Sequence, residues 1–441
     1  MDDRAALEAS GLWDAAWYAR TYPDVALSGL DPAEHFLRLG RLLRRDPSPR
    51  FSTAWALDTD ARRRASPRPP VLAPAGPLEG AAVPQAAWRL AREGQDGRAL
   101  ALLEAHLPAE RAAVAHVLRA DAAARRGREA EWLAALNLYL GRAGLAPLVL
   151  EGQGPLVARL STAPLPEARG PLVSVLMAAF DAEATVEAAA RSVLRQTWRD
   201  LELIVVDDAS RDGTGEALRR LAAEDPRLRV RRNRVNVGPY VSRNLALGEA
   251  RGAWVTGQDA DDWSHPQRLE QHMGLALRRR LRASLGHMLR MTPEGAFGHV
   301  SAVGPYAPDG VARRSMISCL YEARLLRETL GFWDSVRFGA DSEMAARAEA
   351  ALGRPLPALP LVGMLCLDHP RSLTNHPESG VRKDGGLSAA REAYRRSWRA
   401  ALAAGPGPGG LFLPLVQEPR RHAADPAMTV DPADVRANLG P

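Results

Sequence analysis

Apolar strand-like runs alternate with helical patterns between residues 173 and 267, and three of these runs end in acidic or polar residues. The strong runs are 173–177, 203–206 and 253–256, a weaker one covers 227–231, and helices are expected near 186–194 and 241–249. Strands joined by helices over so short a span require right-handed crossovers and a mostly parallel sheet. In such a sheet the carboxyl ends of the strands share one edge, where ligands bind. The sequence therefore predicts an α/β domain with its site at that edge.

Carboxylates from distant parts of the chain gather at this predicted edge. The three segments are Phe180-Asp181-Ala182-Glu183, Val206-Asp207-Asp208-Ala209-Ser210 and Asp259-Ala260-Asp261-Asp262. Asp259 and Asp261, two residues apart at the end of a strand, can direct oxygen ligands at one hard divalent cation such as Mn²⁺ or Mg²⁺, which keeps positions open for substrate phosphates. Such a cation would neutralise charge on a departing nucleoside diphosphate. The sequence therefore predicts a site for a metal ion and a polyphosphate.

Three other ligand-binding patterns are absent from the sequence. A dinucleotide-binding fold requires Gly-x-Gly-x-x-Gly after its first strand, whereas this strand is followed by Ala-Ala-Phe-Asp-Ala-Glu. A Walker-type loop needs a lysine at a strand-to-helix turn, and the one lysine, Lys383, is far from any such turn. No Gly-x-Ser-x-Gly nucleophile elbow is present. Metal-assisted binding of a diphosphate is the reading that remains.

Composition bounds the number of domains and the class of partner. A chain of 441 residues, 46% of them hydrophobic, is expected to form two or three domains with at least one sizeable core. All but one of its 58 basic residues are arginines, and the net charge of +6 fits an arginine-rich, solvated surface. Because no basic block is interleaved with aromatic residues, nucleic acid is not expected as a partner. With no apolar signal core and no run of about 18 apolar residues, a cytoplasmic protein is expected, at most peripheral at the inner face of the membrane.

Changes in composition divide the chain into five segments. Residues 1–58 contain aromatic residues spaced for short helices, 59–84 form a Pro/Ala-rich linker, and 85–168 show the periodicity of a tetratricopeptide-like helical hairpin scaffold, with breaks at Gly94, Gly97 and Gly127. Residues 169–400 are the α/β domain, and 401–441 form a Gly/Pro-rich tail that is expected to be loosely ordered. The expected architecture is an α/β domain preceded by all-α segments, whose helices offer a surface to a protein partner.

Several motifs between Val173 and Gln267 occur together and in a set order. They are Val173-Ser174-Val175-Leu176-Met177-Ala178-Ala179-Phe180-Asp181-Ala182-Glu183, Ser192-Val193-Leu194-Arg195-Gln196-Thr197, Val206 to Thr214, Asn236-Val237-Gly238, Ser242-Arg243-Asn244 and Asp259-Ala260-Asp261-Asp262. This segment resembles the nucleotide-binding half of an inverting family 2 glycosyltransferase with a GT-A fold, the nucleotide-diphospho-sugar transferase fold with a mostly parallel central sheet. Residues 1–58 resemble the short aromatic repeats found beside the catalytic domain in some bacterial polysaccharide glycosyltransferases.

The resemblance implies roles for the residues that match the donor-binding motifs of the family. Phe180, Glu183 and Asp208 would surround the base, usually uracil, with Asp208 accepting a hydrogen bond from the ring N–H. Phe180 stands where the family commonly has tyrosine, so stacking is retained without the hydroxyl contact. Arg243 would reach the ribose or the diphosphate, whereas Asp207 is expected to cap a turn.

The resemblance also implies a metal site and a closing loop. Asp259 would lie near the ribose and the metal, Asp261 would bind the metal, and Asp262 replaces it if the register differs by one residue. Residues 366–374 resemble the family's flexible loop that closes over the diphosphate. In that loop His369 would complete the metal shell and Arg371 would neutralise phosphate, although a lone histidine is more often structural.

The catalytic base is expected in the acceptor-binding half of the domain. The segment from Phe338 to Arg347 resembles the family's segment that carries this base, and Asp341 is the residue chosen for the role. Inverting transfer needs an unprotonated carboxylate within hydrogen-bond reach of the attacking hydroxyl. Glu343 is the alternative base, and the structural alternative for Asp341 is a helix N-cap.

The leading hypothesis is a metal-dependent inverting glycosyltransferase. It would move a sugar from a nucleotide-sugar donor, a UDP-sugar by resemblance, to a saccharide or lipid-linked acceptor in bacterial surface polysaccharide synthesis. A second hypothesis is a non-catalytic carbohydrate-binding or assembly module that retains the nucleotide-binding fold. A sugar-phosphate nucleotidyltransferase ranks last, because the sequence lacks its glycine-rich activating loop.

Overall fold

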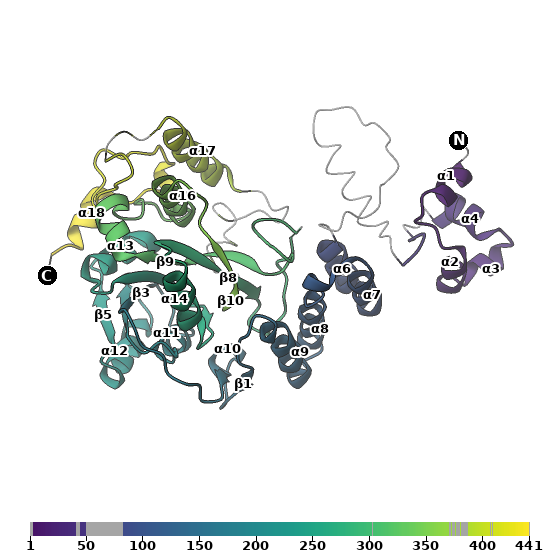
Figure 1. Ribbon diagram of the computed structural model, residues 1–441, viewed down its shortest axis with the longest axis horizontal. Helices are drawn as coiled ribbons and strands as arrows, with labels where there is room; N and C mark the ends of the chain where they lie inside the picture. Colours follow the sequence, from purple (N-terminus) through teal and green to yellow (C-terminus); the bar gives the residue numbers. More distant parts are fainter. Residues whose placement is uncertain are drawn as a thin grey trace. The chain divides into compact units, whose positions relative to one another are not determined.

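The computed structural model describes residues 3–40, 45–49, 83–301, 303–369, 372, 375, 380, 387–405, 407 and 409–440. The chain forms two compact units, Met1–Tyr139 with His299–Val311 and Leu140–Gly298 with Ala312–Pro441 (Figure 1). The five segments expected from the sequence stay a prediction, because this division is coarser. Residues 59–82 of the expected linker lie outside the described residues. In the described part of the chain no helix is long and apolar enough to cross a membrane.

The first unit begins with the short helices expected from the aromatic spacing. They are α1 (Asp3–Ala9), α2 (Ala15–Thr21), α3 (Asp24–Ser28), α4 (Pro32–His35) and η1 (Phe36–Gly40). Tyr18 and Phe36 are buried at the centre of their small aromatic core. Asp31 accepts hydrogen bonds from the first amides of α4 and thereby starts that helix.

Longer helices complete the first unit. They are α6 (Val83–Arg92), α7 (Asp96–His106), η3 (Ala109–Arg111), α8 (Val114–Arg125) and α9 (Glu129–Gly141). Gly94 and Gly127 separate neighbouring helices with φ angles of 77° and 65°, which glycine adopts without steric cost. The break expected at Gly97 is wrong, because this glycine lies in the first turn of α7. A helical glycine costs only about 0.5–1 kcal/mol relative to alanine, and the buried face of α7 offsets that cost.

The second unit contains a small strand pair and one large mixed sheet. The pair is β1 (Leu148–Leu150) and β2 (Leu160–Thr162), on either side of α10 (Leu156–Arg159). The large sheet has the strand order β5-β4-β3-β6-β9-β8-β10-β7. Its strands are β3 (Val173–Ala179), β4 (Leu201–Asp207), β5 (Leu228–Arg232), β6 (Trp254–Asp259), β7 (Trp263–Ser264), β8 (Ala283–Met291), β9 (Arg313–Glu322) and β10 (Ala358–Leu367).

The expected parallel half is confirmed. Strands β5, β4, β3 and β6 are mutually parallel, and Ala178 and Ala179 of β3 pair with Asp259 of β6 and Asp207 of β4. The three acidic strand ends therefore lie at one edge of the sheet. In the other half β9 runs antiparallel between β6 and β8, β10 is parallel to β8, and β7 closes the edge in antiparallel pairing.

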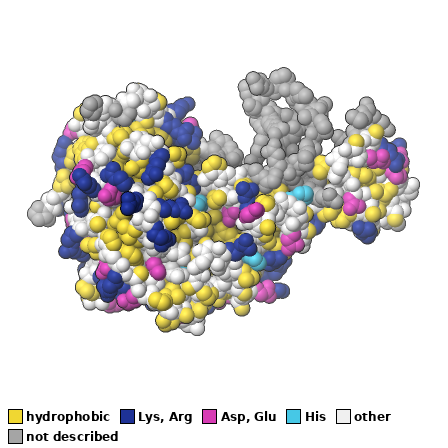
Figure 2. All heavy atoms as spheres, viewed as in Figure 1, with side chains coloured by type: hydrophobic (Ala, Val, Ile, Leu, Met, Phe, Trp, Pro, Cys, Tyr) yellow, Lys and Arg dark blue, Asp and Glu magenta, His cyan; other side chains and the backbone are white. Residues whose placement is uncertain are grey.

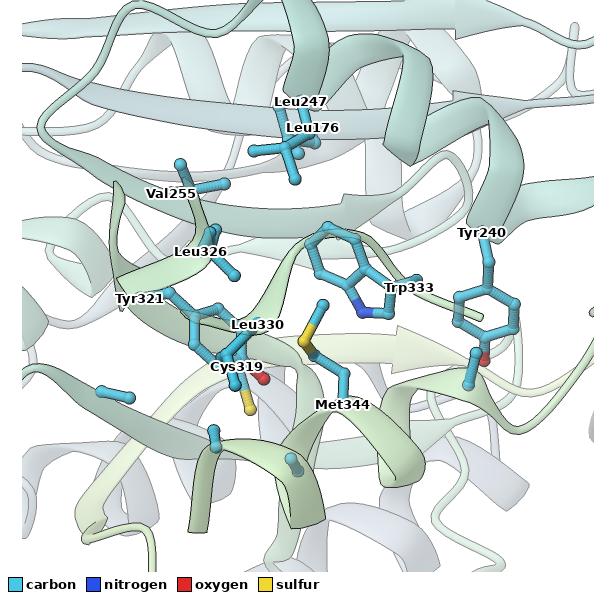
Figure 3. Packing of buried hydrophobic residues seen from close by; sticks show 14 of the residues in the cluster. Leu176, Tyr240, Leu247, Val255, Cys319, Tyr321, Leu326, Leu330, Trp333 and Met344 are labelled. Atoms are coloured by element: carbon cyan, nitrogen blue, oxygen red, sulfur yellow. The ribbon is translucent and has the colours of Figure 1, made fainter. Parts of the chain in front are cut away.

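Helices cover both faces of the sheet (Figure 1). One face packs against α11 (Val186–Leu194), α12 (Thr214–Glu224) and α14 (Arg268–Arg278), and the other against α13 (Gly238–Glu249), α16 (Ala340–Leu352) and α17 (Ala389–Ala403), with α15 (Ala323–Leu325) and η4 (Leu326–Leu330) nearby. Val173, Val175 and Met177 point to the first face and Leu176 to the second, because side chains alternate along a strand. Figure 3 shows the core on this second face, where the side chains of Trp333 and of Met344 from α16 pack toward the sheet.

The C-terminal segment is better ordered than the sequence led us to expect. Leu413 exchanges backbone hydrogen bonds with Leu330 and Phe332, and Val430 and Val435 pack on α13. The segment also contains η5 (Pro426–Met428) and α18 (Pro432–Ala437). The expectation of a loose tail is wrong, because apolar residues spaced among the glycines and prolines are buried in the second unit.

The surface of the second unit is rich in arginine. Figure 2 shows dark blue arginine side chains spread over its visible face, with apolar and neutral atoms between them. Many of them are paired, as Arg191 is with Glu187 and Glu224. This distribution agrees with the solvated arginine-rich surface expected from composition.

Candidate active site

The end of β4 is fixed by two buried carboxylates. Asp207 accepts hydrogen bonds from the Ser210 amide at 2.9 Å and from Arg232, so it organises the turn after the strand. Asp208 accepts hydrogen bonds from the amides of Val237 and Gly238, at 3.0 and 2.7 Å. Burial raises the pKa of Asp208, and these hydrogen bonds oppose that rise. Asn233 also donates to the Asp208 carboxylate at 2.7 Å, so several hydrogen bonds hold this group at the edge of the sheet.

The loop after β3 lies directly beside the β4 loop. Phe180 is 51% exposed at this edge, so its ring face is open to a ligand. Glu183 is also exposed, and its carboxylate accepts the Gly213 amide at 2.7 Å. Asp181 accepts the Arg211 amide at 2.8 Å. These bonds join the two loops at one edge of the sheet, and the base pocket of Phe180, Glu183 and Asp208 stays a prediction.

Three carboxylates meet at the end of β6. Asp259, Asp261 and Asp262 each offer an oxygen atom, and these atoms lie within 4.8 Å of one another. Asp262 is 5% exposed and accepts the Leu367 amide at 3.0 Å. Burial, followed by the charges of Asp261 and Asp259, raises the pKa of Asp262 well above its usual range. A cation would relieve this repulsion.

Asp259 faces further charges across the rim. Desolvation by the surrounding protein, then the charges of Asp261 and Asp341, raise its pKa, whereas its ion pair with Arg243 lowers it. Asp341 therefore lies on the same side of the sheet as residues 259–262, which are called the acidic turn below.

The predicted loop residues are only partly described. The Nε2 atom of His369 lies 2.8 Å from an Asp261 oxygen, and this hydrogen bond is the main cause of a raised His369 pKa. A carboxylate-rich cluster with one imidazole beside it is a donor set that Mn²⁺ or Mg²⁺ accepts. Arg371 lies outside the described residues, so its predicted contact with phosphate stays a prediction.

The two candidate bases differ sharply in their surroundings. Asp341 is partly exposed in the first turn of α16, where its carboxylate accepts the Ser342 amide at 2.7 Å. The N-cap of α16 is Gly339, so Asp341 is not the cap. Glu343 is fully buried and paired with Arg347 at 2.6 Å and with His422 at 3.2 Å. A carboxylate held in this way has no access to an acceptor hydroxyl.

Sequence reasoning missed two residues at this edge. The Tyr240 ring is 7% exposed, and the Arg243 guanidinium lies 5.4 Å from its centroid. Burial, and then the charge of Asp341, raise the pKa of Tyr240. Arg268 is 2% exposed beneath the acidic turn and donates to side chains and a carbonyl on either side of it, from Thr256 to Ser264. The sequence did carry a signal for Arg268. It stands four residues before His272, on the same face of α14 as the buried apolar residues of that helix, and this spacing indicates a buried arginine.

One cavity in the described part of the chain does not coincide with these groups. It has a volume of about 250 Å³ and lies between residues 157–167 and α11. None of the described residues that line it is a predicted site residue. The candidate site is therefore defined by its carboxylates and not by a deep cavity.

Comparison with known proteins gives the family. The model of the Glycosyl transferase family 2 matches residues 174–303. The Rhizobium meliloti (strain 1021) succinoglycan biosynthesis protein ExoO is 27% identical over 296 residues, which cover 60% of this chain and 82% of that protein. The Escherichia coli UDP-Glc:alpha-D-GlcNAc-diphosphoundecaprenol beta-1,3-glucosyltransferase WfgD is 30% identical over 149 residues, or 34% of this chain and 58% of that protein.

Coverage of other relatives is shorter. For three further curated glycosyltransferases the chain spans 38%, 50% and 31% of their own length. The crystal structure of S. aureus TarS 1–349 in complex with UDP-GlcNAc aligns with a TM-score of 0.38 and 19% identity, over 45% of this chain and 58% of that one. The matched segment carries the parallel half of the sheet and the acidic turn, and by that match residues 174–303 form a glycosyltransferase family 2 domain.

Proposed function

We propose that this protein is a metal-dependent inverting glycosyltransferase that uses a UDP-sugar as donor. The acceptor would be a saccharide or a lipid-linked sugar of bacterial surface polysaccharide synthesis. The observation that carries the proposal is the meeting of the Asp259, Asp261 and Asp262 carboxylates at the ligand-binding edge, with Asp341 close enough to raise the pKa of Asp259. The similarity to WfgD, whose name pairs a UDP-sugar donor with a diphosphoundecaprenol-linked acceptor, supports the proposed donor and the proposed acceptor.

The donor nucleotide would lie across the loops after β3 and β4. The exposed ring of Phe180 offers a flat apolar face for the base, and Asp208 would accept a hydrogen bond from a base N–H in place of one of its present donors, such as Asn233. Glu183 borders the same pocket. Arg243 sits against Asp259, where it would turn toward the ribose or the diphosphate as the donor enters.

The acidic turn fits a divalent cation. Its oxygen ligands suit Mn²⁺ or Mg²⁺, and its mutually repelling carboxylates gain from a positive charge between them. Asp261 and Asp259 would hold the ion, with His369 beside Asp261 as a further ligand. When bound, such an ion neutralises charge on the leaving diphosphate.

Asp341 would act as the general base. Its carboxylate takes the proton from the acceptor hydroxyl, whose oxygen bonds to the anomeric carbon as the bond from that carbon to the diphosphate oxygen breaks. The attack comes from the side opposite the leaving group, which inverts the anomeric configuration. Partial exposure at the start of α16 leaves Asp341 open to an acceptor, in contrast to Glu343.

Calorimetric titration with UDP, GDP and TDP, each with and without Mn²⁺, tests the donor and metal assignments. We expect Mn²⁺-dependent binding of UDP that disappears in Asp208→Ala and Asp261→Ala, with thermal melting unchanged in the second variant. Binding that is independent of Mn²⁺, or full retention in Asp261→Ala, would contradict the metal assignment. No binding of any nucleotide would favour a non-catalytic module that keeps the fold.

Two further expectations remain proposals. Association with the inner face of the membrane would bring the site to a lipid-linked acceptor. A protein partner would use the helices of the first unit.

A further inference from the structure

Arg290 lies at the point where strand β8 meets the loop that carries His369. It pairs with Cys366 across the parallel β8–β10 ladder, one residue before the end of β10. Its side chain is 11% exposed, and its Nη2 atom donates to the Leu367 carbonyl and the Ser372 hydroxyl, both at 3.3 Å. The same guanidinium is 3.6 Å from an Asp368 oxygen.

Arg290 contacts described residues on both sides of His369, and Leu367, Asp368, His369 and Ser372 are together called the turn below. The Asp368 amide donates to the Met291 carbonyl at 2.7 Å, which attaches the turn to the end of β8. Asn375 donates to the Asp368 carboxylate at 2.6 Å, and the Ser372 amide donates to the His369 carbonyl at 3.0 Å. Arg290 therefore reaches both ends of the turn.

The turn brings His369 to the acidic cluster. His369 reaches Asp261 at 2.8 Å from the outer side, and the Leu367 amide donates to Asp262 from the inner side. One partly buried cation thus bonds residues on both sides of His369.

We infer that Arg290 is a positioning residue that bonds Leu367 and Ser372, on either side of His369, so that His369 stays on Asp261. The inference rests on the proposed function, since it assigns Arg290 a part in completing the divalent-metal site. The two hydrogens on Nη2 can bond the Leu367 carbonyl and the Ser372 hydroxyl together, and the rigid guanidinium plane fixes the direction of both bonds. Arg290 acts through His369 and not as a ligand.

A double-mutant cycle on Mn²⁺ affinity in the presence of UDP tests this inference. Loss of a residue that orients a metal ligand typically weakens metal binding about 10–100-fold, and we expect that loss in Arg290→Ala. His369→Ala should weaken binding to a similar extent, and the double variant should match His369→Ala within about threefold, because coupled residues are not additive. Arg290→Lys should fall between wild type and Arg290→Ala. Additive losses in the double variant would overturn the inference.

Arg314→Ala is the matched control. Arg314 lies on the neighbouring strand β9, is 20% exposed, and donates to the Leu356 carbonyl and pairs with Glu349. We expect its loss to leave Mn²⁺ affinity unchanged. An equal loss of affinity in Arg314→Ala would show that removing any arginine from this half of the sheet disturbs the site, and would overturn a specific role for Arg290.

Hydrogen exchange gives a readout that needs no metal. In Arg290→Ala without ligands, the amides of Leu367 and Asp368 should exchange faster, whereas those of the parallel half of the sheet should not change. Faster exchange with no Mn²⁺ binding even by wild type would uphold the positioning of the turn and refute the metal part of the proposed function. Unchanged exchange together with unchanged Mn²⁺ affinity would overturn the inference and leave the proposed function standing.

Discussion

The choice between the two candidate bases can be tested with one pair of isosteric changes. Asp341→Asn and Glu343→Gln each remove one negative charge and keep the shape of the side chain. The amide oxygen of Asn can still accept the Ser342 amide, so the start of α16 should be unaffected by the first change. The second change acts on a fully buried group.

The surroundings of Glu343 determine how much stability Glu343→Gln loses. Arg347 is 1% exposed and donates to both Glu343 oxygens, at 2.6 and 2.9 Å, and His422 lies 3.2 Å from one of them. Removing one partner of a buried ion pair costs about 3–5 kcal/mol, because the other charge is left without compensation. At about 2–4 °C per kcal/mol for a domain of this size, the melting temperature should fall by roughly 6–20 °C.

Asp341→Asn should leave the stability almost unchanged and should lower the rate of transfer. A change at a partly exposed position usually alters stability by less than about 0.5 kcal/mol, whereas loss of a general base lowers kcat by about 10²–10⁴. Calorimetric melting gives the first quantity, and UDP release from a panel of UDP-sugars below the melting range of both variants gives the second. A stable but inactive Glu343→Gln, or an active Asp341→Asn, would refute the assignment of Asp341.

Three other predictions concern stability and the acidic turn. Burial alone would raise the pKa of Glu343, but Arg347 and His422 hold it below its usual value. The stabilisation from Glu343 is therefore present above its unfolded pKa of about 4.3 and is lost as the pH falls through the lower folded pKa. In urea unfolding between pH 7 and 3, the free energy of unfolding should fall less steeply with acid in Glu343→Gln than in the wild type. Deletion of residues 406–441 removes four buried apolar side chains, Leu413, Met428, Val430 and Val435. Burial of each contributes about 1.5–3 kcal/mol, and their sum is comparable with the whole free energy of unfolding of a domain. The truncated protein should therefore show no cooperative melting by circular dichroism. Arg268→Met removes the bonds that fix the acidic turn from below, and we expect Mn²⁺ affinity in the presence of UDP to fall about 10–100-fold, measured by calorimetry.

The parallel half of the fold was predictable because its signals are local. Each strand from Val173 to Asp259 is a short apolar run followed by a polar turn, and each crossover helix begins within a few residues of that turn. Handedness and parallel pairing then follow from the short connections. Asp207, Asp208 and Asp259 could be placed at one edge for this reason, with no knowledge of their contacts.

The mixed half was not predictable in the same way. Strand β9 inserts between β6 and β8, and β8 pairs with β10 some seventy residues later, as in the contact between Arg290 and Cys366. No local pattern fixes such a pairing, because many apolar runs can add to an open sheet edge. The role inferred for Arg290 depends entirely on that pairing. Tyr240 was missed for a related reason, since its neighbour Asp341 is distant in sequence.

The placement of Asp341 depends on the part of the chain that composition assigned to a loose tail. Arg347 of α16 donates to the Leu411 carbonyl at 3.1 Å, and His422 contacts Glu343 on the same helix. Arg420 donates to Asp334, in the loop that leads into α16, at 2.7 Å. The C-terminal segment therefore braces the helix that presents the proposed base. A domain cut at residue 400 would keep every donor-binding residue named above and yet lose the contacts that fix α16 together with the buried side chains of the C-terminal segment, so cooperative melting and transfer should be lost together in such a fragment.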